Sequence, residues 1–104
     1  MMPDSWSVEY LPDASEDFDH LVHSQQLLVS KAIQKVSRNP LPQSEGGYGK
    51  PLRGPLAGLC KIKLRGAGLR VVYKLERVES RMVIVVISIR DDGVVYDLAE
   101  KRNK

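Results

Sequence analysis

The sequence predicts an α+β domain of two layers, in which a helical hairpin packs on a small, mainly antiparallel sheet. Three observations lead to this prediction: apolar residues at helical spacing in the first third, three β-rich runs further on, and short connections between those runs. A chain of 104 residues has the size of one compact domain, so we expect residues 1–104 to form a single unit. Hydrophobic residues make up 42% and charged residues 28% of the chain, a composition typical of folded proteins.

The first third of the chain contains one strand pattern and two helix patterns. Apolar and polar side chains alternate over residues 6–10, which predicts a half-buried strand. Asp13 is placed to cap a first helix, and a polar break at Ser24 separates it from a second helix that ends at residues 38–40. Residues 39–49 hold two prolines and three glycines, so we expect a mobile surface loop there.

Three β-rich runs follow, over residues 58–64, 69–76 and 82–89. The connections between them are short, which predicts an antiparallel meander. The third run is apolar at nearly every position, as expected for a central strand that is covered on both faces. The predicted order is therefore β-α-α-β-β-β, and the sequence leaves open whether the first strand pairs beside the third run.

The composition argues against membrane, disulfide-stabilised and metal-cluster proteins. The longest apolar run, residues 82–89, is far shorter than the roughly 20 residues of a membrane helix, and the N-terminus lacks a basic-then-apolar signal pattern. Cys60 is the only cysteine, which excludes an internal disulfide. His20 and His23 lack a recognised metal-binding pattern around them. We therefore expect a cytoplasmic protein with no membrane partner, metal or cofactor.

Charge is distributed unevenly along the chain. Residues 1–49 contain three Lys or Arg residues against seven Asp or Glu, whereas residues 50–104 contain thirteen against six. Lys and Arg gain affinity for nucleic acids by releasing counterions from the phosphates. The basic second half therefore suggests a polyanionic partner.

Basic side chains are concentrated in the first of the three β-rich runs. With the period of two that a strand has, Lys61, Lys63 and Arg65 share one face, and Arg70 begins the next run after a four-residue connection. Two interpretations remain open: the exposed strand carries charge to prevent unwanted pairing, or the row binds an anion. The density of like charge argues for an anion, because it costs folding energy where nothing anionic binds. Further candidates for such a site are Arg53, Arg90 and Tyr96.

A cationic site of this kind can cleave RNA without a metal, by letting a ribose 2′-hydroxyl attack the adjacent phosphate. Such a site needs a base, an acid and cations. Crowding by neighbouring cations disfavours the charged form of a lysine, and Lys61 is followed closely by Lys63 and Arg65. The planar guanidinium of Arg70 suits the charge that develops on a transferring phosphate. Tyr96 either stacks on a base, donates a hydrogen bond, or serves only in packing.

Five stretches of the sequence form a set that is also found in a known protein family. They are Lys50-Pro51-Leu52-Arg53-Gly54, Cys60-Lys61-Ile62-Lys63-Leu64-Arg65, Gly68-Leu69-Arg70-Val71-Val72-Tyr73, Val85-Val86-Ile87-Ser88-Ile89-Arg90 and Val95-Tyr96. With these stretches the chain resembles the RelE toxins of the RelE/ParE toxin–antitoxin superfamily. The opening strand and helical hairpin also fit, so the resemblance spans nearly the whole chain and is densest over residues 50–96.

The resemblance implies the toxin of a type II toxin–antitoxin system, which inhibits translation. The family's activity is that of an mRNA interferase, a ribosome-dependent and metal-independent endoribonuclease that cuts mRNA in the ribosomal A site. It leaves a 2′,3′-cyclic phosphate and a 5′-hydroxyl. By position, Lys61 and Lys63 match the family's two active-site lysines. Arg70 matches its phosphate-stabilising arginine, and Tyr96 matches an aromatic residue that helps to orient the message.

The second catalytic arginine of the family lies between the last strand and this tyrosine. Here the connection is short, Arg90 is the only arginine in it, and Asp91 and Asp92 follow. Carboxylates beside an RNA site repel phosphate, so we expect either reduced activity or a changed arrangement of the site. Arg53 and Arg65 are candidates for RNA binding outside the catalytic set.

The resemblance also implies partners: a cognate antitoxin that covers the basic face, and the ribosome with its mRNA. Contact with DNA would be indirect, through the antitoxin. The alternative function is that of a ParE-like inhibitor of DNA gyrase, which shares the fold and acts through protein contacts. ParE-like chains generally lack the lysine pair, so Lys61 and Lys63 favour the nuclease. A non-catalytic basic domain that binds ribosomes or RNA is a third reading if Arg90 is misplaced.

Overall fold

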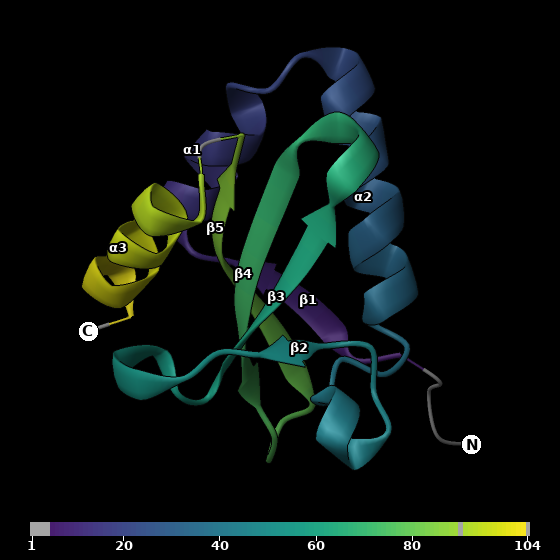
Figure 1. Cartoon of the computed structure of the whole chain (residues 1–104). Helices are drawn as coiled ribbons and strands as arrows, with labels where there is room; N and C mark the ends of the chain where they lie inside the picture. Colours follow the sequence, from purple (N-terminus) through teal and green to yellow (C-terminus); the bar gives the residue numbers. More distant parts are fainter. Residues whose placement is uncertain (1–4, 90, 104) are drawn as a thin grey trace.

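The computed structural model describes residues 5–89 and 91–103 and contains a five-stranded sheet flanked by helices (Figure 1). The strands lie in the order β1-β5-β4-β3-β2, and all neighbours are antiparallel except β1, which runs parallel to β5. The strands are β1 (Ser7–Tyr10), β2 (Lys50–Pro51), β3 (Leu59–Leu64), β4 (Leu69–Glu76) and β5 (Arg81–Ser88). The helices are α1 (Pro12–Asp19), α2 (His23–Val36) and α3 (Asp92–Arg102), with short 3₁₀ turns η1 (Gln43–Glu45), η2 (Gly54–Leu56) and η3 (Arg65–Ala67). In the described part of the chain, no helix is long and apolar enough to span a membrane.

The strand β5, an inner strand of the sheet, is covered on both faces, as its apolar sequence predicts. It lies between β1 and β4, and its side chains are buried from Met82 to Ile87. Ala14 of α1 and Ile33 of α2 pack with Ile84 of β5 in the core on one face. The three β-rich runs correspond to β3, β4 and β5 to within one residue at each end, and the meander is confirmed.

The helix α3 lies on the opposite face and is absent from the predicted order. Asp91 caps it by accepting a 3.0 Å hydrogen bond from the backbone N–H of Val94. Val95 and Ala99 follow each other by one turn and are fully buried against this face of the sheet. The apolar stripe is narrow and residues 90–93 have the composition of a loop, so the sequence pattern concealed the helix. The α+β class is confirmed, with a third helix added to it.

The predicted ends of the two N-terminal helices were partly wrong. α1 begins at Pro12, whose ring presets the backbone of a first helical residue, so Asp13 lies in the first turn and does not cap the helix. The break between α1 and α2 falls at residues 20–22, and Ser24 already belongs to α2. The Gln25 side chain sets this start by accepting a 3.1 Å hydrogen bond from the backbone N–H that precedes α2.

Residues 39–49, where a mobile surface loop was expected, form a segment with internal backbone hydrogen bonds and the η1 turn. The backbone N–H of Gln43 donates to the carbonyl of Gly49 at 2.7 Å. Gly49 is buried, and a Cβ there would lie 2.3 Å from the hydroxyl of Tyr73, so a larger residue would force the packing to shift. That hydroxyl donates a 2.7 Å hydrogen bond to the carbonyl of Pro40. The segment is therefore joined to the core through Tyr73.

Replacing Tyr73 with Phe should lower the free energy of unfolding by about 1–3 kcal/mol, because the buried Pro40 carbonyl loses its donor. Burial raises the pKa of the Tyr73 phenol, and the Cys60 thiol beside it adds to this, so the hydroxyl stays protonated. Urea denaturation measures the change. In the matched control Tyr48→Phe, the side chain is 50% exposed and we expect a change within about 0.5 kcal/mol. Equal losses in the two variants would contradict the role given to this hydrogen bond.

Candidate active site

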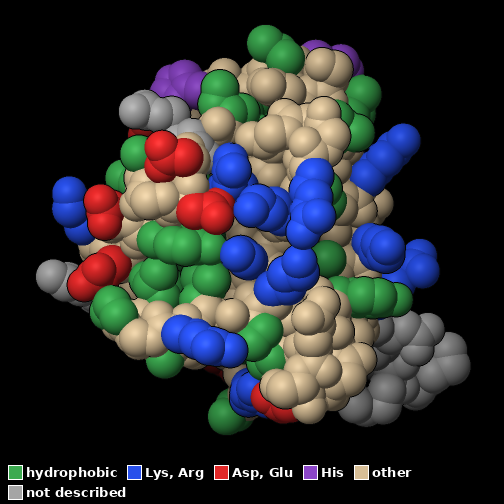
Figure 2. Space-filling model, in the orientation of Figure 1, with side chains coloured by type: hydrophobic (Ala, Val, Ile, Leu, Met, Phe, Trp, Pro, Cys, Tyr) green, Lys and Arg blue, Asp and Glu red, His purple; other side chains and the backbone are tan. Residues whose placement is uncertain are grey.

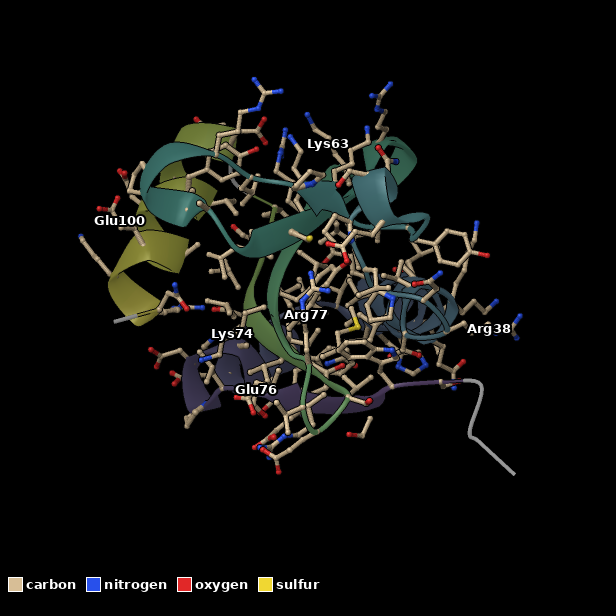
Figure 3. The ribbon with its side chains drawn as sticks, turned by 90° about the horizontal axis from the view of Figure 1, so that it is seen from below. Arg38, Lys63, Lys74, Glu76, Arg77 and Glu100 are labelled. Carbon is tan, nitrogen blue, oxygen red and sulfur yellow. The ribbon has the colours of Figure 1, made fainter. Side chains whose placement is uncertain are left out.

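Basic side chains of β2, β3 and β4 meet on the face of the sheet that α3 partly covers. Directly opposite residues of antiparallel strands share a face. Lys61 lies opposite Lys50, and Lys63 lies opposite Arg70. Figure 2 shows Lys and Arg side chains gathered over this face, with acidic side chains at the edge of the group. Figure 3 shows Lys63 on the opposite side of the sheet from α1. We call Lys50, Lys61, Lys63 and Arg70 the basic cluster.

The helix α3 brings Tyr96 to the basic cluster. The Nζ of Lys61 donates a 2.9 Å hydrogen bond to the Tyr96 hydroxyl and lies 5.6 Å from the centroid of its ring. The ring also packs at the border of the core under α3. Tyr96 therefore packs against the core and also presents its hydroxyl to the cluster, where it accepts a hydrogen bond; its stacking on a base stays a prediction.

Asp92, the first residue of α3, reaches between two cations of the cluster. One carboxylate oxygen, Oδ1, accepts a short hydrogen bond from the Nε of Arg70. The other, Oδ2, lies 3.4 Å from the Nζ of Lys63. The three side chains are partly exposed, at 23% for Arg70, 28% for Lys63 and 37% for Asp92. The carboxylate thus pairs with both cations at the surface of the protein.

The electrostatics of this contact favour the ionised form of Asp92. Partial burial by itself would raise the pKa of the carboxyl, and it is the largest single influence. The hydrogen bond from Arg70 and the positive charges of Lys63 and Arg70 act in the opposite direction and together lower the pKa below its ordinary value. The contact is therefore a charged one at neutral pH.

Arg102 holds the far end of α3 in place. Its guanidinium donates to both oxygens of Asp17 in α1, at 2.6 and 3.2 Å, and to the carbonyl of Val85 at 2.9 Å. Asp17 also accepts a 3.1 Å hydrogen bond from the backbone N–H of Ile87. These contacts occupy the edge of β5 beyond the end of β1. Tyr96 and Asp92 are consequently carried by a helix that is anchored to the sheet.

The other predicted site residues lie around or outside the basic cluster. β3 ends at Leu64, so Arg65 starts the η3 turn and does not continue the row of Lys61 and Lys63. Arg65 instead lines a cavity of about 230 Å³ beside Lys63 and Arg70. Arg53 is exposed just before η2, and among the described residues no hydrogen bond or ion pair joins it to the cluster. Arg90 lies outside the described residues.

Two residues of the site were not predicted from the sequence. The position of Lys50 opposite Lys61 follows from the pairing of the two-residue strand β2, which local periodicity does not reveal. Asp92 was expected to repel phosphate, but its contact with Lys63 and Arg70 depends on the position of α3. Asp is a preferred N-cap residue, so Asp91 offered a local signal for a helix start, which the loop-like composition of residues 90–93 outweighed. Within residues 5–89 and 91–103, no three His, Cys, Asp or Glu side chains are grouped as a metal site requires.

Replacing Arg70 with Ala should raise the pKa of Asp92, because the variant loses the hydrogen bond and the charge that favour the carboxylate. A carbon-detected NMR titration of the carboxyl groups measures this pKa. Because the pKa of Asp92 is lowered in the folded wild type, the ion pair stabilises the fold above the ordinary pKa of an aspartate. This stabilisation is lost as the pH falls through the lowered pKa of Asp92. The matched control Lys31→Ala, which removes an exposed cation from α2, should leave the Asp92 midpoint unchanged. An unchanged Asp92 midpoint in the variant would contradict the contact.

The similar proteins of known sequence or structure described below are RelE-like toxins. No family model matches the chain. A RelE-like toxin protein of Escherichia coli is 30% identical over 100 residues, which cover 93% of this chain and 96% of the relative. A mutant of the E. coli toxin RelE, solved in the free state, superposes with a TM-score of 0.78 at 22% identity, covering 94% of this chain and 97% of that one.

A second similar structure comes from a complex. The toxin–antitoxin complex RelBE2 of Mycobacterium tuberculosis contains a chain that is 29% identical, with a TM-score of 0.69, covering 83% of this chain and 99% of that one. The sequence likeness to the E. coli relative extends over nearly all of both chains, and the fold agrees with that of the solved toxins. The chain therefore belongs to the family of RelE-like toxins.

Proposed function

We propose that this toxin is a ribosome-dependent, metal-independent endoribonuclease that cuts mRNA in the ribosomal A site and thereby inhibits translation. The observation that carries the proposal is the convergence of Lys61, Lys63 and Arg70 on one face of the sheet, with the Tyr96 hydroxyl 2.9 Å from the Nζ of Lys61. These are the four residues that match the family's active-site positions. The basic cluster comes from neighbouring strands and Tyr96 from an anchored helix, which suits a site that must hold a phosphate in a fixed geometry.

The proposed reaction is a transesterification within the RNA, so its atoms balance without a further reactant. The ribose 2′-oxygen forms a bond to the adjacent phosphorus, and the P–O5′ bond breaks, which leaves a cyclic phosphate and a 5′-hydroxyl. A base accepts the 2′ proton, and an acid supplies a proton to the 5′-oxygen. Lys61 and Tyr96 share a hydrogen bond and are the candidates for moving these protons. Lys63 and Arg70 are placed to stabilise the charge that develops on the phosphate.

The proposed partners follow from the same surface. The M. tuberculosis relative occurs in a toxin–antitoxin complex. For this chain we propose a cognate antitoxin that covers the basic cluster and prevents access of RNA. The ribosome and mRNA are the partners of the free toxin, and DNA is contacted only through the antitoxin. These partners place the protein in the cytoplasm.

The nuclease proposal is tested by primer extension on mRNA in a reconstituted translation reaction, with and without ribosomes. We expect cuts within codons that depend on ribosomes. The double variant Lys61→Ala, Arg70→Ala should cut at least about 10²-fold more slowly, because it lacks a proton-transfer group and a transition-state cation. The control Lys31→Ala, Arg38→Ala removes the same charge from exposed positions on or after α2 and should cut normally.

Two outcomes would contradict the nuclease. Equal cutting by wild type and the Lys61, Arg70 double variant would separate the activity from the basic cluster. Intact message, together with blocked DNA supercoiling in a parallel gyrase assay, would instead assign the ParE-like function. Circular dichroism of all variants shows that the comparison is made between folded proteins.

A further inference from the structure

The carboxylate of Asp92 is an anion that is already bound to the basic cluster. The two oxygens of the Asp92 carboxylate are divided between Arg70 and Lys63. A phosphodiester has two non-bridging oxygens and one negative charge. It can therefore accept hydrogen bonds from Lys63 and Arg70 as the two carboxylate oxygens of Asp92 do. We propose that Asp92 occupies the position of an RNA phosphate between Lys63 and Arg70, and that RNA has to displace it before these cations can act. The inference rests on the proposed function, because it concerns how the same site is regulated.

The position of Asp92 is imposed by the fold. Asp91 caps α3, Val95 and Ala99 are buried against the sheet, and Arg102 anchors the last turn to α1 and β5. The start of α3 is therefore directed at the cluster even without the ion pair. The backbone of Asp92 is already ordered in α3. The carboxylate therefore reaches Lys63 and Arg70 without the loss of conformational entropy that ordering a loop or a terminus would require.

The contact of Asp92 with Lys63 and Arg70 is exposed enough for another anion to displace the carboxylate. Asp92 keeps 37% of its side chain accessible, and Lys63 and Arg70 are also partly exposed. Ion pairs at such positions contribute little net free energy, because water solvates the separated charges well. An incoming phosphodiester that also contacts Lys50, Lys61 or Arg65 can replace the carboxylate. The site therefore binds isolated anions weakly and binds a polyanion with several phosphates more tightly.

The inference is tested by the affinity for a 2′-O-methyl RNA tetranucleotide, which cannot undergo attack by a 2′-hydroxyl. Asp92→Asn keeps the size of the side chain and removes its charge. We expect this variant to bind the probe about fivefold more tightly than wild type, the effect of one charge at ion-pair distance in a water-like dielectric. Asp92→Ala should show the same direction. The matched control Asp97→Asn removes an exposed charge from the same helix and should bind as wild type does.

A double-mutant cycle separates occupation of the phosphate position from general repulsion. If Asp92 competes for Arg70, the gain from Asp92→Asn should shrink strongly in an Arg70→Ala background. General repulsion would leave that gain unchanged and would overturn the proposal. Wild-type affinity in Asp92→Asn would also overturn it. So would slower mRNA cleavage by Asp92→Asn with unchanged probe affinity, because that would make Asp92 a catalytic residue.

The probe cannot be cut, so its binding is independent of the nuclease activity. Tighter binding by Asp92→Asn, without any mRNA cleavage by the wild type, would support the occupied site and contradict the nuclease. Ribosome-dependent cleavage without any effect of Asp92→Asn on probe affinity would support the nuclease and contradict the occupied site.

Discussion

The pairing of β4 with its neighbours is the constraint on which the rest of the structure depends. β4 lies between β5 and β3, and its register with β3 places Arg70 directly opposite Lys63. A slip by one residue would turn the side chains of β3 to the other face, removing the lysines from the cluster and the apolar residues from the core. Packing of β3 itself opposes such a slip, because Cys60 is buried in the core and Ile62 and Leu64 pack against that core.

The site is completed by a helix that adds groups of opposite character. α3 supplies Tyr96, which touches Lys61, and Asp92, which neutralises part of the cluster. Both are held by the same anchor, the Arg102 guanidinium on Asp17 and the carbonyl of Val85. Asp92, at the start of α3, is thus a part of the site, because it pairs with Arg70 and Lys63. In the proposed function, the Asp92 carboxylate competes with a phosphate of the RNA for Lys63 and Arg70.

Membership in the RelE-like toxin family and the geometry of the cluster address different questions. The likeness to the E. coli relative extends over nearly the whole chain and identifies the family. Function depends on particular side chains, because one fold can carry several activities. The convergence of Lys61, Lys63, Arg70 and Tyr96 is the observation that supports the proposed nuclease over a toxin that acts through protein contacts alone.

The sequence by itself determined the strands β3, β4 and β5, the two N-terminal helices and the row of lysines, because these follow from local periodicity and from short connections. The α+β class follows from the same patterns. The tertiary structure decided the parallel pairing of β1 with β5, the placement of Lys50 opposite Lys61, and the docking of α3. It also decided that Arg65 leaves the row and that Asp92 enters the cluster. These features depend on contacts between segments far apart in the chain, which a local pattern cannot encode.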